Sequence, residues 1–266
     1  MEFLSIYGSY VKIFLKSRME YRISFFTGLT VNFYRYFISY ITFWALVQRF
    51  NSIEGWSFEE MTLLYGLNVV TYAIAGIFFW YTVYHLENEI TSGNLDSYLI
   101  RPMGVIKQMM CRRFGDTFLG QILVTIIFMI LAIYKINYRM TFFSYIYLVF
   151  AIIGGIFFQA GAMIILGSLS FWLLRTDSLS MTLYYDIRSM IQYPLTIFPQ
   201  YIGFILTFVL PYAIINYYPS LIILMKVQTC SDLIIGLLSP LIGVMIFGLS
   251  ILVFNRGLRR YSGSGS

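Results

Sequence analysis

Residues 61–84 read MTLLYGLNVVTYAIAGIFFWYTVY, and the chain soon continues with the polar segment EITSGNLDSYLIRP at residues 89–102. A helix needs about 20 predominantly apolar residues to cross the hydrocarbon core of a bilayer. The first segment is long enough, so it predicts a membrane-spanning helix. The second segment carries charges of both signs, so it predicts a loop at one face of the membrane.

The composition of the whole chain favours an integral membrane protein. Hydrophobic residues make up 59% of the 266 residues and charged residues 11%, whereas soluble domains have about 45–50% and about 25%. No long polar block leaves room for a separate globular domain, so we expect residues 1–266 to form a single membrane domain. The N-terminus lacks the features of a cleavable signal peptide. Cys111 and Cys230 are too few and too far apart for a disulfide framework.

Six apolar stretches are long enough to cross a bilayer as helices. They lie near residues 23–47, 61–84, 116–134, 142–174, 195–216 and 233–254. The sequence therefore predicts an all-α membrane protein with six transmembrane helices. The long fourth stretch could instead form two short spans hinged at Gly154-Gly155, which would reverse the orientation of everything after it.

The distribution of basic residues favours six spans with both termini in the cytoplasm. In that arrangement the inner segments carry Lys12, Lys16, Arg18, Arg22, Arg101, Lys107, Arg112, Arg113, Arg175, Arg188, Arg256, Arg259 and Arg260. The outer segments carry only Arg49, Lys135, Arg139 and Lys226. This asymmetry follows the positive-inside rule. The net charge of +6 is then explained by orientation against an anionic inner leaflet, without nucleic-acid binding.

Residues 1–22 have the pattern of an amphipathic helix. Phe3, Tyr7, Tyr10 and Phe14 recur at helical spacing, and Lys12 and Lys16 occupy the opposite stripe. We expect this helix to lie along the inner membrane surface, with its lysines toward lipid phosphates.

Several kinds of chemistry are missing from the sequence. No Gly-x-x-x-x-Gly-Lys-(Ser/Thr) loop is available to bind nucleotide phosphates, and His85 is the only histidine. We expect no enzymatic activity, no metal site and no cofactor in this chain. The spans contain almost no acidic residues, whereas proton-driven transporters usually carry Asp or Glu in their membrane segments. Energy for transport would have to come from a partner.

The polar segment after residue 84 changes sign along its length. Glu87, Glu89 and Asp96 come first, and Arg101, Lys107, Arg112 and Arg113 follow. Gly93-Asn94 predicts a break and Pro102 the end of a short helix. Such a helix could dock into a groove on another protein, or the segment could be a solvated loop at the lipid headgroups. The residues alone leave both interpretations open.

The segment at residues 93–102 also resembles a known pattern. It is similar to Gly-x-Leu-Asp-x-Tyr-Leu-(Leu/Ile)-Arg-Pro, which ends the first cytoplasmic loop of the membrane permeases of type-2 ATP-binding-cassette (ABC) exporters. In that family the loop holds a coupling helix that docks into the ATPase subunit. The resemblance assigns this ATPase-coupling role to Glu89, Gly93, Leu95, Asp96, Tyr98, Leu99, Arg101 and Pro102.

The same resemblance implies how the protein is assembled. It predicts a six-span permease in the bacterial plasma membrane that pairs with a second permease subunit, identical or related. Two copies of an ABC ATPase subunit would bind ATP and Mg, and the membrane lipid would surround the permease. A short surface or re-entrant helix before the last span is also implied, near residues 220–225.

Two further regions have more than one interpretation. Residues 175–193 could form a second docking element or a plain loop. Arg35, with Asn32 one turn before it, lies in the first apolar stretch. These two residues are candidates for the substrate pathway, or they lie near the membrane interface. Asn68, Gln121 and Gln159 are expected to hold neighbouring helices together by hydrogen bonds.

Two other function classes remain alternatives to the exporter. One is an ATP-independent secondary transporter or channel, and the other is a non-transporting membrane anchor or sensor subunit. Aromatic residues make up 20% of the chain, which suits an amphipathic cargo without identifying it.

Overall fold

The structure, a computed structural model, describes residues 2–48, 52–112, 114–136, 141–173 and 176–262. These residues form helices and no β-strand, in agreement with the all-α prediction. The longer helices are α1 Glu2–Glu20, α2 Arg22–Gln48, α3 Phe58–Tyr84, α7 Phe118–Lys135, α8 Phe142–Ser168, α9 Asp177–Met190 and α12 Cys230–Arg260. The shorter helices are α4 Leu86–Thr91, α5 Asp96–Leu99, α6 Val105–Arg112, α10 Gln200–Phe204 and α11 Tyr217–Ile223. Short 3₁₀ segments lie at Leu169–Phe171, Leu195–Ile197 and Tyr212–Ile214, and a π-helical turn at Ile205–Val209.

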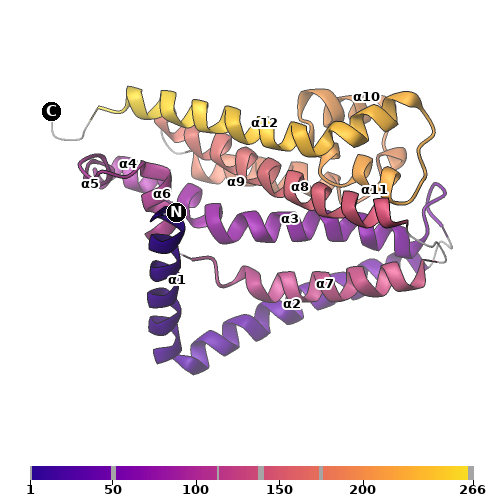
Figure 1. Cartoon of the computed structure of the whole chain (residues 1–266), viewed down its shortest axis with the longest axis horizontal. Coiled ribbons are helices and arrows are strands. Elements are labelled where there is room, and N and C mark those ends of the chain that lie inside the picture. The colour runs from indigo at the N-terminus through magenta and orange to yellow at the C-terminus, as the bar shows by residue number, and fades with distance from the viewer. Residues whose placement is uncertain (1, 49–51, 113, 137–140, 174–175, 263–266) are drawn as a thin grey trace.

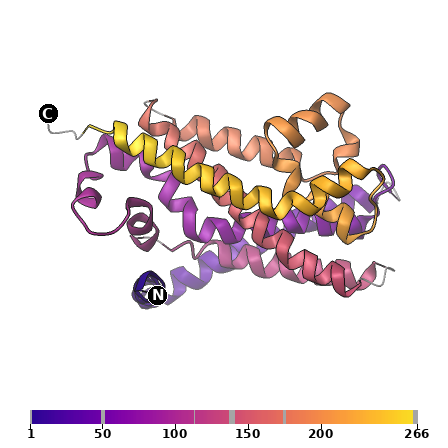
Figure 2. The ribbon, with the colours of Figure 1, turned by 45° about the horizontal axis from the view of Figure 1, so that its top comes forward.

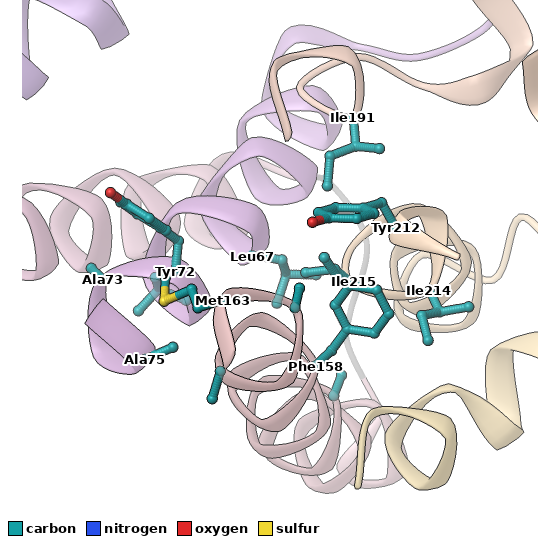
Figure 3. Close-up of a cluster of buried hydrophobic side chains, with 14 of the residues drawn as sticks. Leu67, Tyr72, Ala73, Ala75, Phe158, Met163, Ile191, Tyr212, Ile214 and Ile215 are labelled. Atoms are coloured by element: carbon teal, nitrogen blue, oxygen red, sulfur yellow. The ribbon is translucent and has the colours of Figure 1, made fainter. Parts of the chain in front are cut away.

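Helix α3 is the centre of the bundle (Figure 1). Of its most apolar stretch 89% is buried, against 22% for α12 at the periphery. Figure 3 shows Leu67 of α3 beside Phe158 of α8 and Ile215 of the irregular segment before α11. These side chains are apolar and fully or almost fully buried. The apolar run at residues 61–84 therefore forms the core of this chain.

The α8–α12 interface depends on glycine. A Cβ on Gly154 would lie 2.9 Å from the Pro240 carbonyl oxygen, and one on Gly161 would lie 3.0 Å from the Phe247 backbone nitrogen. Small residues let the two backbones approach closely. Because both sequence numbers rise together along the contact, the two helices run in the same direction.

Pro240 lies inside α12 and has no N–H to donate to the Gly236 carbonyl. Two hydroxyl groups replace it. The Tyr147 hydroxyl of α8 donates to the Gly236 oxygen, and Ser239 Oγ donates to the same oxygen at 2.7 Å. An apolar layer tolerates a helix break only where such partners exist.

Because α8 and α12 are parallel, the chain between them has to run back to the end of the bundle where α8 begins. Helix α9 covers most of this distance. Tyr184 and Arg188 of α9 are 2% and 8% exposed. The Trp80 and Tyr185 rings are 5.5 Å apart, and Arg188 bonds Asn68, so α9 runs antiparallel to α3. Residues 177–190 therefore form a packed helix, so the plain-loop interpretation is wrong, and Arg188 is buried instead of lying at a surface. The docking alternative stays a prediction.

The apolar stretch at residues 195–216 does not form the continuous span that its hydropathy predicts. Proline at 199 and 211 interrupts it, because proline removes backbone donors and blocks helix continuation. Instead, Gln200–Val209 and Tyr212–Ile223 form a pair bent by 80°. Residues 218–224, at the end of this pair, are buried against the bundle.

By length and composition, four helical segments could cross a membrane: Phe58–Thr91, Phe118–Lys135, Phe142–Phe171 and Cys230–Arg260. The bent pair would make five. Helix α2 is long enough but less apolar, since it carries arginine, asparagine and several hydroxyl residues. The fourth stretch is one helix through Gly154-Gly155, so it is not split there; its expected last residue, Leu174, lies outside the described residues.

Helix α1 lies across the end of the bundle where α4, α5, α6 and the C-terminus also lie (Figures 1 and 2). Its Tyr7 and Phe14 rings contact Phe78 and Phe114, with centroids 5.7 and 6.1 Å apart. The side chain of Phe3 lies outside the described part of the chain, as do Arg49, Arg113, Arg139 and Arg175. Most of the other basic residues are at the α1 end.

Candidate functional site

The loop between α3 and α7, residues 85–117, contains most of the residues with a predicted role. It folds into the three short helices α4, α5 and α6. Gly93 has a φ of +73°, a conformation that favours glycine. This turn reverses the chain between α4 and α5, and the Leu95 N–H donates to the Glu89 carbonyl at 3.0 Å.

Three of the predicted coupling residues point into the loop itself. Glu89, Leu95 and Tyr98 are 9%, 0% and 4% exposed. Arg112 Nη1 donates to Glu89 Oε1 at 2.9 Å and also to the Tyr98 hydroxyl. Gln108 Nε2 donates to the Tyr98 carbonyl at 2.8 Å. The contacts of Glu89, Leu95 and Tyr98 within the loop hold α4, α5 and α6 together. The side chains of these three residues are therefore unavailable to a partner.

Four other predicted residues, together with Ile100, form an exposed surface, which we call the loop tip. It consists of Asp96, Leu99, Ile100, Arg101 and Pro102. Leu99 is 48% exposed and Ile100 is 85% exposed. An apolar side chain this exposed at a charged turn is typical of a contact surface. The sequence interpretation omitted Ile100, although its place between Leu99 and Arg101 could have indicated it.

The hydrogen bond between the Tyr98 hydroxyl and Arg112, helped by the nearby Glu89 carboxylate, raises the pKa of the Arg112 guanidinium. The charge of Arg112 is therefore fixed, and it balances a buried carboxylate.

A cavity of about 680 Å³ separates the loop from α1. Arg101, Lys107 and Arg112 line its loop side, and Tyr10 lines its α1 side. Below the cavity the loop is attached to both neighbours. The Gly115 N–H donates to the Ile77 carbonyl at 3.1 Å, and Arg18 of α1 pairs with Asp116 at 3.2 Å. A displacement of the loop would therefore act on α1 as well as on α3.

Arg35 and Asn32 are not part of this loop. Asn32 Nδ2 donates to the Gly28 carbonyl of its own helix at 3.0 Å. Arg35 is exposed on α2, with its guanidinium carbon 5.5 Å from the centre of the Tyr36 ring. A backbone approach at Gly120 connects this part of α2 to α7. The structure thus gives Asn32 a local bond and leaves Arg35 on the surface of the single chain.

A buried polar cluster lies between α3, α8 and α9. Gln159 Nε2 donates to Asn68 Oδ1 at 3.4 Å, and Arg188 Nε donates to the same oxygen at 3.1 Å. The Tyr184 hydroxyl donates to Gln159 Oε1. Asn68 and Gln159 therefore join helices as expected, whereas Gln121 is buried with no hydrogen-bond partner among the described residues. The sequence did not predict that Arg188 would be buried in this cluster, because the residues around it are as polar as those of a loop.

Comparison with known proteins gave one positive result. The family model described as ABC-2 family transporter protein matches residues 33–265. The match includes the loop at residues 85–117 and all helices from α3 to α12. No curated protein and no solved structure matches the chain.

Proposed function

Since the chain belongs to the ABC-2 family of transporter proteins, we propose that it is the permease subunit of an ATP-driven exporter. The family implies a membrane component that associates with an ABC ATPase. This chain would provide the substrate pathway. The partner would bind ATP and Mg and supply the energy, because the sequence has no phosphate-binding loop.

The loop tip is the surface that docks on the ATPase. The observation that carries this assignment is the division of the loop into two sides. Glu89, Leu95 and Tyr98 are used internally, and the tip presents two apolar side chains between Asp96 and Arg101. Interfaces typically combine such an apolar centre with a polar rim.

Six crossings follow if α2 also lies in the membrane and if α9, which ends inside the bundle, completes a crossing together with the segment after it. In the order α2, α3, α7, α8, α9 and α12 the helices alternate in direction. Both termini and the loop then lie on one side, which we take as the cytoplasm of a bacterial cell because basic residues are concentrated there. Helix α1 would lie at the inner membrane surface, and the bent pair would be re-entrant from the outer side.

The working assembly contains two permease subunits, identical or related, and two ATPase subunits. Helix α9 exposes Tyr185, Asp186 and Ser189, which are polar groups at the depth of the bundle. Lipid contact with such groups is costly. A second permease facing this surface would cover them and enclose a pathway between the two chains.

Charge reversal at the loop tip tests the coupling role. Asp96→Lys and Arg101→Glu are expected to abolish co-purification of the ATPase subunit, since both side chains are exposed at the proposed contact. Arg259→Glu, an exposed arginine at the end of α12, is the matched control and should keep the ATPase bound. If both tip variants retain ATPase binding and ATP-driven transport, the coupling assignment is wrong.

Transport in vesicles without ATP would instead support a secondary transporter or channel. If deleting the gene leaves resistance to exported compounds unchanged, an anchor or sensor subunit is favoured.

A further inference from the structure

Arg188 is a buried cation with no buried counter-charge among the residues that the structure describes. Its side chain lies in the last turn of α9, and the residue is 8% exposed. Its guanidinium carbon lies 3.7 Å from the centre of the Tyr72 ring, where a cation–π interaction is favourable. Asn68 lies near the middle of α3, so Arg188 is at the depth of the bundle centre and far from either end of α3.

No carboxylate pairs with Arg188 in the described part of the chain. The ion pairs found there involve Arg18, Arg112 and Lys226. Asp186 is on the same helix but is exposed, and residues two apart do not face each other. A buried charge without a partner is expensive, so such a residue is retained only where something offsets the cost.

The hydrogen-bonding capacity of Arg188 is also only partly used. A guanidinium offers several N–H donors in a planar fork, and among the described residues the Arg188 side chain makes one hydrogen bond, from Nε to Asn68. The contacts of the guanidinium are the Tyr72 ring and the Asn68 amide. Both groups are neutral, so they solvate the cation without neutralising it.

The phenol groups of Tyr72 and Tyr185 connect Arg188 to the exposed side of α9. The Tyr72 hydroxyl lies 3.2 Å from the Tyr185 hydroxyl, and Tyr185 is 41% exposed. The partly exposed Tyr185 is therefore linked to the buried guanidinium through Tyr72, and its hydroxyl can act as a donor. A planar guanidinium fork with nearby hydroxyl donors is well suited to a phosphate or carboxylate group.

We propose that Arg188, with Tyr72 and Tyr185, binds the phosphate or carboxylate group of an amphipathic molecule within the permease. The inference rests on the proposed transport function and adds a substrate class to it. The anionic group approaches from the exposed side of α9, its charge compensates Arg188, and its apolar part stays among the aromatic side chains. The amphipathic molecule is either an exported compound or an anionic lipid of the bilayer.

The experiment measures binding to the permease co-purified with its ATPase, in nanodiscs of phosphatidylcholine and without ATP. Dodecyl phosphate is the anionic probe, and dodecyl maltoside is the neutral probe with the same chain. The wild type should bind dodecyl phosphate at least about tenfold more tightly, as expected for a desolvated charge pair. Arg188→Gln should remove this preference, and Arg188→Lys should retain much of it because the charge remains.

Arg256→Gln is the matched control, since it removes an exposed arginine of α12 and should leave the preference unchanged. Equal binding of the two probes by the wild type would overturn the proposal without any variant having to fold. A preference that survives in a folded Arg188→Gln protein would overturn it as well.

One further measurement distinguishes an exported compound from a bilayer lipid as the source of the ligand. A second distinguishes failure of the coupling proposal from failure of the anion-site proposal. ATP-dependent movement of dodecyl phosphate in vesicles identifies an exported compound, and displacement by phosphatidylglycerol without movement identifies a bilayer lipid. Both results retain the anion site. If the loop-tip variants keep the ATPase bound while the Arg188-dependent preference is present, the coupling proposal fails and the anion site stands.

Discussion

At the scale of single residues, the Arg112 guanidinium connects two of the short helices of the loop. Arg112 bridges Glu89 of α4 and Tyr98 of α5. The sequence pattern indicated both Glu89 and Tyr98 as coupling residues, and it is the structure that separates them from the exposed tip. The pattern could not reveal this division, because the inward face of a one-turn helix is decided by residues of α6 that come later in the chain.

Arg112→Gln should loosen the loop. It leaves the Glu89 carboxylate buried without its cation, and we expect a loss of about 1 kcal/mol, reduced by the partial exposure of Arg112. Thermal unfolding and limited proteolysis within residues 85–117 would measure it. The double variant Glu89→Gln with Arg112→Gln should recover part of the loss, and no recovery would argue against a direct pair.

Gly93→Ala should also destabilise the loop, because Gly93 has a positive φ. An L-residue in that conformation costs about 1 kcal/mol. Gly104→Ala is the control in the same loop, since a Cβ there meets open space and needs no unusual backbone angle. The same unfolding temperature for both variants would show that the turn at Gly93 can relax.

At the scale of helices, hydropathy predicts those elements whose environment is uniformly apolar. Helices α3, α7, α8 and α12 lie close to the stretches expected from the sequence. Helix α9 was missed because its buried side carries Arg188 and tyrosines that are satisfied by Asn68 and Gln159 from other helices. The stretch at residues 195–216 was predicted as a span because hydropathy counts only apolar character. It does not account for the backbone N–H groups that are missing at proline.

The end of α9 illustrates the same point. Its last carbonyls lie inside the bundle and need partners from elsewhere. Asn68 Nδ2 donates to the Arg188 carbonyl at 3.3 Å, and Asn216 Nδ2 donates to the Ile191 carbonyl. A polar helix can end inside the bundle because two buried side-chain amides donate hydrogen bonds to its last carbonyl groups.

Gly154→Ala should weaken the α8–α12 interface. The new methyl group would overlap the Pro240 backbone, and overpacking of this kind costs about 1–3 kcal/mol. Gly248→Ala on the same helix pair is the control, since a Cβ at Gly248 has no neighbour within 4 Å. Unfolding temperatures in detergent would measure both, and equal temperatures would mean that the two helices can separate without cost.

At the scale of the whole molecule, both termini and the loop lie at one end, and the start of α12 lies at the other (Figure 1). Cys230 is exposed at the start of α12, and Cys111 is buried in the loop. The two cysteines are unpaired, as their positions in the sequence predicted. This distribution makes the orientation in the membrane measurable.

A membrane-impermeant maleimide should label Cys230 in intact cells and leave Cys111 unmodified. Arg259→Cys in a Cys230→Ser background should react only in inverted vesicles. Labelling of position 259 in intact cells would place the loop tip outside the cell, where no ATPase subunit could reach it.

The contact between α1 and the loop determines which part of the permease can move. Arg18 joins α1 to Asp116, and α1 continues almost directly into α2, which packs mainly on α7. The glycine contacts, by comparison, bind α8 tightly to α12. A pull on the loop by the ATPase would therefore act on α1 and, through it, on α2, and would shift α2 relative to α3, while α8 and α12 stay together. Cross-linking α2 to α3 would then block transport even though the ATPase stays attached.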